Sequence, residues 1–246
     1  KNRSITIVPE IELPGHSLSL LSCYPQYSCT GGPFKPKCLW GPDEEILCAG
    51  NDEALAFLEK ILDDVIELFD SAFIHCGGDE VIKTRWQNCT KCQKRIKDEN
   101  LGNVENLQGW VTEHFSNYLE SRGRRLIGWD EIIDCNYSLP SSTTIMSWQG
   151  VSGGLKAARL GHDVIMSPAT YLYLDHYQFD AAEPYEYIGN LLTANQIYRY
   201  DPCDGLEEKY HKHILGIQGD IWTAYVFNNE ELQWKTFPRI LSVAEI

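Results

Sequence analysis

Short apolar runs and longer amphipathic stretches alternate along most of the chain. Six runs of apolar or β-branched residues have the length of buried parallel strands. They lie at residues 5–8, 73–76, 126–128, 144–147, 164–167 and 214–217. Strands that alternate with helices form βαβ units, so the pattern predicts an α/β fold with a parallel sheet.

Most of the segments between these runs have apolar residues at helical spacing. Asn51 or Asp52 is a typical cap for a segment in which large apolar residues recur every three or four positions as far as Phe69. Residues 106–121 repeat the pattern, and residues 155–160 form a shorter helix that ends at Gly161, a common cap residue. A last helix is expected from Glu230 onward.

The organisation predicts one domain over residues 1–246, because no linker, charge block or low-complexity stretch divides the chain. Six strand–helix units are visible, whereas a (β/α)8 barrel needs eight. The chain is therefore either a doubly wound open sheet or a barrel with part missing. Strand periodicity does not decide between them.

Composition narrows the function classes. The hydrophobic share of 43% is enough for a real core, and no apolar run approaches the roughly 18 residues of a membrane span. The 35 acidic residues against 21 basic ones give a net charge of −14, which argues against nucleic acid or an anionic membrane as partner. Neutral, hydroxyl-rich ligands stay compatible with this charge and with the seven tryptophans.

Nine cysteines are many for a cytosolic enzyme. Cys89 and Cys92 form a C-x-x-C pair, but no second pair stands at zinc-ribbon spacing, so we expect no structural zinc. A disulfide would be useful in the glycine- and proline-rich stretch that holds Cys23, Cys29, Cys38 and Cys48. An oxidising compartment, and hence export, is the resulting expectation, although no signal peptide is present in the chain.

Acidic and aromatic residues follow five of the predicted strands. In parallel α/β folds the carboxyl ends of the strands share one face, where ligands bind. We therefore expect these side chains to converge there. They are Asp79-Glu80, Trp129-Asp130-Glu131, Trp148, Tyr171, Tyr173 and Asp175, and Asp220 with Trp222.

Asp79 and Glu80 are the first candidates for chemistry. Gly77 and Gly78 precede them and let the backbone bend so that both carboxyl groups are presented to the site. Adjacent carboxyl groups in a partly dry site push their pKa values apart, so that one serves as a general acid while the other stays ionised. This suits cleavage of an acetal. The alternative is a capped helix start with solvated acids.

Several of these segments together resemble a known family. The run His75-Cys76-Gly77-Gly78-Asp79-Glu80 is similar to the His-x-Gly-Gly-Asp-Glu signature of family 20 β-N-acetylhexosaminidases. Residues 8–16, Val-Pro-Glu-Ile-Glu-Leu-Pro-Gly-His, resemble that family's Pro-Glu-Ile-x-x-Pro-Gly-His segment. Gly128-Trp129-Asp130-Glu131, Trp148, Tyr173-Leu174-Asp175 and residues 218–222 follow in the family's order.

The resemblance implies a (β/α)8 barrel that removes terminal N-acetylglucosamine or N-acetylgalactosamine from glycans with retention. Such enzymes use substrate-assisted catalysis through an oxazolinium ion, with neither a metal nor an organic cofactor. Glu80 would be the general acid, and Asp79 would orient the acetamido N–H. Tyr173 would bind the acetamido oxygen, Asp175 a ring hydroxyl, and His16 would lie behind Glu80. Trp129, Trp148 and Trp222 would form the pocket walls.

Two departures from the family stand out. The chain begins at what should be the third barrel strand, which makes residues 5–8 strand three and residues 214–217 strand eight, so we expect a fragment of a larger enzyme. Where the family has Trp-Thr-Glu or Trp-Ser-Glu, this chain has Trp222-Thr223-Ala224. The lost carboxylate leaves the identity of the sugar open, and a 6-O-sulfated sugar is conceivable.

Three hypotheses follow. The first is a retaining exo-β-N-acetylhexosaminidase that acts on N-acetylhexosamine-containing glycans. The second is a catalytically inactive sugar-binding relative, which Ala224 suggests and which the intact Asp79, Glu80 and Tyr173 oppose. The third is a barrel glycosidase with a protein nucleophile, for which Asp130 and Asp220 are the candidates. The oligomeric state stays open.

Overall fold

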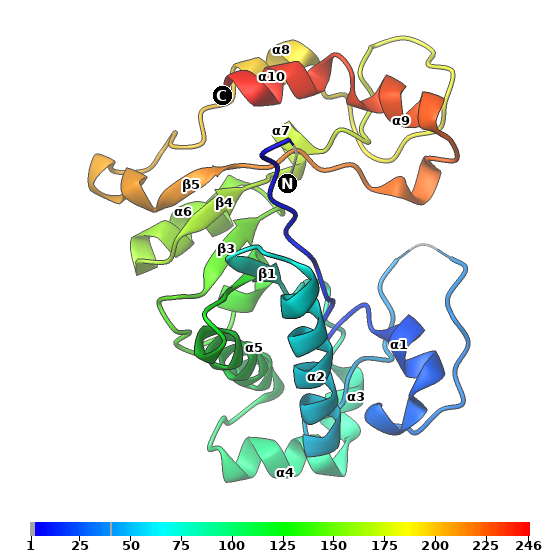
Figure 1. Ribbon diagram of the computed structural model, residues 1–246, viewed down its shortest axis with the longest axis vertical. Helices are drawn as coiled ribbons and strands as arrows, with labels where there is room; N and C mark the ends of the chain where they lie inside the picture. Colours follow the sequence, from blue (N-terminus) through cyan, green and yellow to red (C-terminus); the bar gives the residue numbers. More distant parts are fainter. Residues whose placement is uncertain (1–2, 40) are drawn as a thin grey trace. The chain divides into compact units, whose positions relative to one another are not determined.

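The computed structural model describes residues 3–39 and 41–246, and two compact units account for it (Figure 1). The first unit is Lys1–Thr144 and the second is Ile145–Ile246. That the chain is a single domain stays a prediction. Within the described residues, no helix is both long enough and apolar enough to cross a membrane.

The first unit carries two parallel strands, β1 (Phe73–His75) and β2 (Arg125–Trp129). Ile74 lies opposite Leu126 in their register, and both are buried. The remaining elements of this unit are α1 (Leu18–Cys23), η1 (Pro25–Tyr27), α2 (Asp52–Leu68), α3 (Thr84–Asn88), α4 (Thr90–Asp98), α5 (Val104–Ser121) and η2 (Asp130–Ile133).

Helices α2 and α5 lie side by side in this unit, cyan and green in Figure 1, and their apolar stripes form its core. The side-chain oxygens of Asn51 and Asn103 accept backbone N–H groups of the first turns of α2 and α5, which fixes where each helix begins. The buried positions recur every three or four residues, as the sequence predicts. They are Leu55, Leu58, Leu62 and Val65 in α2 and Leu107, Val111, Phe115 and Leu119 in α5.

The prediction of a strand at residues 5–8 is wrong. Ile5 and Ile7 are 68% and 64% exposed, and the pairing with β1 lies further along the chain. Pro9 O accepts the His75 N–H at 2.9 Å, and Ile11 N donates to His75 O at 2.9 Å. An apolar run becomes a strand only where a neighbouring backbone pairs with it, and the segment beside β1 is the one that carries Glu10 and Glu12.

The second unit contains nearly all of β3 (Thr144–Ser147), and β4 (Val164–Met166) and β5 (Ile214–Ile217). β4 pairs in parallel with both of the other strands. These positions agree with the sequence prediction. The other elements are α6 (Val151–Leu160), α7 (Ala169–Leu172), α8 (Ala194–Tyr198), η3 (Glu208–His213), η4 (Thr223–Tyr225), α9 (Asn229–Thr236) and α10 (Arg239–Glu245).

Glycine and proline set the helix ends of this unit. Gly161 ends α6 in the left-handed conformation, at φ 91°, as its position in the sequence predicts. The helix predicted from Glu230 onward is instead two helices, because Pro238 has no N–H for a continuous helix and its ring clashes with the preceding turn.

All nine cysteines lie within the described residues, and all are free. The disulfide expected in the stretch that holds Cys23, Cys29, Cys38 and Cys48 is therefore absent. The argument for an oxidising compartment loses its structural basis.

Candidate active site

The turn after β1 presents Asp79 and Glu80, and its two glycines are required. Gly77 and Gly78 have φ of +64° and +96°, a region that L side chains rarely adopt. A Cβ on Gly77 would lie 2.0 Å from Glu12 Oε2, and one on Gly78 would lie 2.5 Å from a methyl carbon of a neighbouring isoleucine. Gln108 of α5 donates to Gly78 O at 2.7 Å, so the helix fixes the turn in place.

His16 stands against both carboxylates. Its Nε2 lies 3.2 Å from Asp79 Oδ2 and 3.3 Å from Glu80 Oε2. The hydrogen bond with Asp79 raises the pKa of His16 above its usual value, although partial burial opposes this. The sequence placed His16 behind Glu80 alone, whereas the structure brings it equally close to Asp79.

The same three residues offer three possible metal-ligand atoms within 4.8 Å of one another. However, the two carboxylates that face His16 favour its protonated form. A protonated imidazole has no lone pair for a metal, so this group is better suited to proton transfer than to metal binding.

Asp79 and Glu80 differ in their access to water. The side chain of Asp79 is 16% exposed and that of Glu80 is 35% exposed. Asp79 Oδ1 is buried without a hydrogen-bond partner among the described residues. It is therefore a ready acceptor for a ligand N–H, while Glu80 can exchange a proton with solvent or with a bound substrate.

Two further carboxylates lie behind the turn, and the sequence analysis gave them no role. Glu10 Oε1 is 3.0 Å from His75 Nδ1 and accepts the indole N–H of Trp129 at 3.2 Å. Burial works against ionisation of Glu10, but the hydrogen bonds from His75 and Trp129 outweigh it and lower the pKa of this carboxyl. Trp129, which is 2% exposed, is thereby fixed by its ring nitrogen.

The pKa of Glu12 shifts in the opposite direction to that of Glu10. Burial, followed by the negative charge of Asp79 and contact with Glu10, raises the pKa of Glu12 to about 10. Glu12 is therefore protonated at neutral pH and adds no charge beside Asp79. The signal for both residues was in the sequence, as acidic residues in the segment that pairs with β1.

The second unit gathers the aromatic residues that the sequence singled out. The rings of Trp148 and Tyr173 stack with centroids 6.4 Å apart and planes 15° from parallel. The ring of Trp222 lies 6.1 Å from that of Tyr173, with the planes tilted by 59°. Tyr173 is 8% exposed and Trp222 is 41% exposed, so part of the Trp222 indole is accessible to a ligand.

Asp175 lies two residues beyond Tyr173 and is 3% exposed. Burial raises the pKa of Asp175 to about 6, although the positive charges of Lys235 and Arg239 and a backbone hydrogen bond from Trp222 oppose this. Its Oδ1 has no hydrogen-bond partner among the described residues. Asp175 is thus mainly ionised at pH 7 and keeps one oxygen for a ligand hydroxyl.

Asp220 and Asp130 are both buried, unlike Glu80. Ser167 and Gln218 donate to opposite oxygens of Asp220, and the Gln218 bond measures 2.6 Å. Asp130 is 4% exposed in η2. Neither carboxylate is presented to solvent as Glu80 is.

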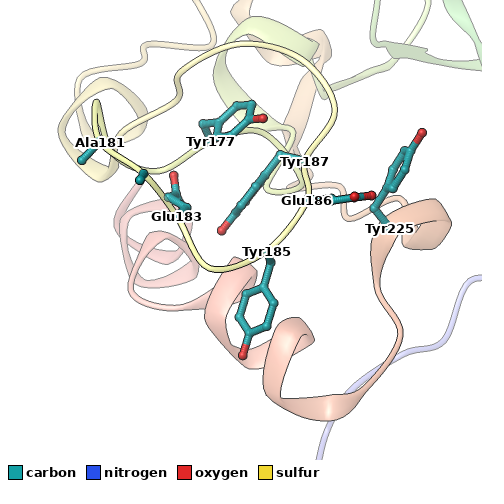
Figure 2. Close-up of a pocket in the computed structure, with 8 residues that line it drawn as sticks. Tyr177, Ala181, Glu183, Tyr185, Glu186, Tyr187 and Tyr225 are labelled. Atoms are coloured by element: carbon teal, nitrogen blue, oxygen red, sulfur yellow. The ribbon is translucent and has the colours of Figure 1, made fainter.

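A separate hollow of about 470 Å³ opens in the second unit, between α7 and α8 in the chain and beside Tyr225 of η4 (Figure 2). Its walls are four tyrosines, two glutamates and two alanines, and sequence patterns gave no sign of it. Tyr177 stacks on Tyr187 with centroids 4.7 Å apart. The Lys235 ammonium lies over the ring of Tyr187, 4.5 Å from its centroid. It donates to the backbone oxygens of Glu186 and Tyr225, two residues that line the hollow.

Comparison with known proteins decides the family. The model of "Glycosyl hydrolase family 20, catalytic domain" matches residues 1–246, the whole chain. The chain belongs to glycosyl hydrolase family 20. The match confirms the resemblance seen in the motifs around His16 and Asp79.

Several similar proteins are named beta-hexosaminidases. A beta-hexosaminidase of Porphyromonas gingivalis is 41% identical over the whole chain, which covers 32% of that protein. A beta-hexosaminidase of Vibrio furnissii is 31% identical over 98% of the chain, which covers 40% of it. The crystal structure of a beta-N-acetylhexosaminidase from Bacteroides fragilis superposes with a TM-score of 0.85 at 33% identity, covering 99% of this chain and 48% of that one.

The chain thus spans a third to a half of these family 20 relatives. Catalytic domains of family 20 are (β/α)8 barrels, so the predicted fold class is confirmed, with the parallel strands and helices described above as part of the barrel. The part of these relatives that the chain matches is the catalytic domain of a glycosyl hydrolase family.

Proposed function

We propose that the protein containing this chain is an exo-acting, retaining β-N-acetylhexosaminidase that removes terminal N-acetylglucosamine or N-acetylgalactosamine from glycans. The observation that carries the proposal is the joint placement of His16, Asp79 and Glu80, with Asp79 Oδ1 left without a partner among the described residues. Support also comes from a Vibrio harveyi structure named an exo-β-N-acetylglucosaminidase in complex with N-acetylglucosamine, 28% identical with a TM-score of 0.85.

Catalysis in this proposal needs no protein nucleophile. The acetamido oxygen of the substrate attacks the anomeric carbon as the glycosidic bond breaks, and an oxazolinium ion forms. Glu80 gives its proton to the leaving oxygen and then takes one from the water that opens the ring. Asp79 Oδ1 accepts the acetamido N–H, and its negative charge stabilises the positive charge that develops there.

His16 and Glu12 set the charge around these two acids. A protonated His16 contacts both Asp79 and Glu80 and can exchange a proton with Glu80 at each turnover. A neutral Glu12 adds no negative charge beside Asp79. Trp129, held by Glu10, contributes an apolar wall.

The second unit supplies sugar contacts in this proposal. Tyr173 donates its hydroxyl to the acetamido oxygen, and the stacked Trp148 together with Trp222 covers the methyl group and the apolar face of the ring. Asp175 accepts a ring hydroxyl at its unpartnered oxygen. Ala224 lies exposed in η4 at the position of the family's glutamate, so this edge leaves room for a substituted sugar, such as a 6-O-sulfated one.

The two competing functions have weaker support. A protein nucleophile would have to be Asp130 or Asp220, and the oxygens of Asp220 are already occupied by Ser167 and Gln218. An inactive sugar binder has no use for a proton-exchanging His16–Glu80 pair. Export stays a prediction.

The proposal is tested by Glu80→Gln in the full-length protein, with Glu67→Gln on the exposed side of α2 as the matched control. Loss of the acid should lower kcat/KM on an unactivated N-acetylglucosaminide by about 10²–10⁴-fold. The loss should be much smaller for the first step with a dinitrophenyl leaving group, which needs little protonation. Equal losses on both substrates, or an unaffected rate, would remove Glu80 from the acid role.

A second variant distinguishes substrate-assisted catalysis from catalysis by a protein nucleophile. Asp79→Asn should abolish the preference for substrates that carry a 2-acetamido group, and a thiazoline mimic of the oxazolinium ion should inhibit the unmodified enzyme. If the enzyme hydrolyses a 2-hydroxy substrate as well as the acetamido one and ignores the thiazoline, a protein nucleophile is indicated instead.

A further inference from the structure

Four thiols that are far apart in the sequence meet in the first unit. Cys29 follows η1, Cys48 precedes α2, and Cys89 and Cys92 lie at the start of α4. Their four sulfur atoms all lie within 4.8 Å of one another. Three of the four side chains are buried, and Cys29 is partly buried.

Three of the six sulfur–sulfur distances match those around a tetrahedrally bound metal ion. The Cys29–Cys92, Cys48–Cys89 and Cys48–Cys92 sulfurs are each 3.7 Å apart. Four thiolates bound tetrahedrally to zinc at about 2.3 Å have sulfur–sulfur distances of about 3.8 Å. A disulfide brings two sulfurs to about 2.05 Å and would leave the other two with no such relation.

The backbone around the thiols is built for close approach. A Cβ on Gly50 would lie 2.1 Å from Lys91 C, so only glycine lets the segment after Cys48 pack against the first turn of α4. The indole of Trp86, itself fully buried, donates to Leu47 O at 2.8 Å and fixes the residue before Cys48 from the other side. The fold therefore holds the sulfurs in place independently of any bond between them.

The chemistry of the group also suits a cation. Thiols are weak hydrogen-bond donors and acceptors, so the contacts between these sulfurs compensate little for their removal from water. A divalent ion at the centre, bound by thiolates, would remove this cost.

We propose that Cys29, Cys48, Cys89 and Cys92 bind one structural Zn²⁺. Four sulfur ligands select a soft or borderline metal, and a site with no open position serves structure and not catalysis. This proposal departs from the sequence-based expectation of no structural zinc. The missing second pair is Cys29 with Cys48, which are too far apart in the sequence to form a zinc-ribbon motif and are brought together by the loop that α1 and η1 begin.

The proposed ion has a definite mechanical role. The segment that carries Cys29 and Cys48 follows the His16 loop, and α4 follows the turn that carries Asp79 and Glu80. Zinc would tie the two segments together beyond the site, so that His16 and the two acids keep their spacing. The chemistry proposed above does not need zinc, so the two proposals can fail separately.

The test is the metal content of the full-length protein, purified without chelators and measured by inductively coupled plasma mass spectrometry. We expect about one zinc per chain, as for a closed four-thiolate site, and less than about a tenth of that in Cys48→Ser and Cys92→Ser. Cys23→Ser and Cys203→Ser, which change thiols outside the group, are the matched controls and should keep the full content.

A second measurement on the unmodified protein decides the case if the serine variants do not fold. Titration with an organomercurial should release zinc to a chromogenic chelator in step with loss of about four thiols per ion, as expected for a four-thiolate site. Protein in which cobalt replaces zinc should show the visible bands of tetrahedral thiolate-bound Co²⁺. Metal-free protein with four titratable thiols, a disulfide among these cysteines, or iron in the purified protein would overturn the assignment.

Discussion

Glu12 in the first unit and Asp175 in the second are both carboxyl groups withdrawn from water, but their neighbours carry opposite charges. Asp79 and Glu10 face Glu12, and its pKa rises to about 10. Lys235 and Arg239 act on Asp175, and its pKa rises only to about 6. Similar burial thus gives a neutral group in one unit and a mainly ionised one in the other at pH 7. Burial raises the pKa of both groups; the negative neighbours of Glu12 add to that rise, and the positive neighbours of Asp175 oppose it.

The cations of the second unit also have a structural task that has no counterpart beside Glu12. Arg239 is fully buried and donates to four backbone oxygens, at 2.8 Å to His176 and Lys235 and at 3.0 Å to Leu192, with Leu174 as the fourth. These oxygens belong to the loop that carries Tyr173 and Asp175 and to α9. In the second unit a buried cation therefore fixes the shape of a loop, whereas in the first unit the buried carboxyl group beside Asp79 is neutral.

The largest effect should come from removing the Arg239 guanidinium, which donates to four backbone oxygens. Arg239→Met leaves four buried carbonyl groups without their donor, and we expect a loss of about 3–5 kcal/mol in the free energy of unfolding. Urea unfolding of the full-length protein measures it, with Arg199→Met on the exposed surface as the control. A loss no larger than that of the control would show that Arg239 is dispensable for the loop.

The next effect tests whether Glu12 is neutral. A carboxyl with a raised folded pKa contributes stability that is fully present below its unfolded pKa of 4.5 and is lost as pH rises through about 10. Glu12→Gln keeps the neutral shape, so its stability relative to the unmodified protein should be unchanged near pH 5 and should rise by a few kcal/mol toward pH 10.

The measurement is the urea midpoint as a function of pH, with Glu67→Gln in α2 as the control. Parallel stability curves for Glu12→Gln and the unmodified protein would mean that Glu12 is ionised across the range. The contrast with Asp175 would then disappear.

Asp175 should titrate in a narrower and more acidic window. Its raised pKa means that stability present below pH 3.8 is lost as pH rises through about 6. Asp175→Asn should gain about 1–3 kcal/mol relative to the unmodified protein across that interval and change little above it. Asp204→Asn, on an exposed turn, is the control in the same urea series, and a gain that continued to pH 9 would place Asp175 in the same class as Glu12.

The smallest effect concerns His16, which is partly exposed. Its raised pKa contributes stability that is present below pH 6.5 and is lost as pH rises through the folded value, and solvent screening keeps this under about 1 kcal/mol. The imidazole signal of His16 in NMR titrations should report a pKa above 6.5, which falls in Asp79→Asn. An unchanged His16 titration in that variant would remove the Asp79 contact as the cause.

Local patterns predicted the regular parts of the fold. Asn51 caps α2, Gly161 ends α6, and the apolar runs at residues 73–76 and 214–217 lie in or around strands, because these signals act between residues close in sequence. The run at residues 5–8 failed, since pairing with β1 depends on which backbone lies beside it. The break at Pro238 was readable in the sequence, but the prediction from residue 230 did not use it.

In the candidate site, too, local motifs were predictable from the sequence and properties that depend on tertiary contacts were not. The motifs around His16, Asp79 and Glu80 were sufficient to identify the family, because each motif is a short run of residues in a fixed order along the chain. The charge states of Glu10 and Glu12 were not predictable, since they depend on distances to His75, Trp129 and Asp79.

By itself, then, the sequence determined the family and most of the alternating strands and helices, which are encoded in short segments. Only the tertiary structure decided that Glu12 is neutral, that Asp79 keeps a free oxygen, and that Cys29 and Cys48 join Cys89 and Cys92. The physical reason is that electrostatic and metal-binding properties depend on separations of a few ångströms between residues that are distant in the sequence. Such separations arise only when the loops and helices pack.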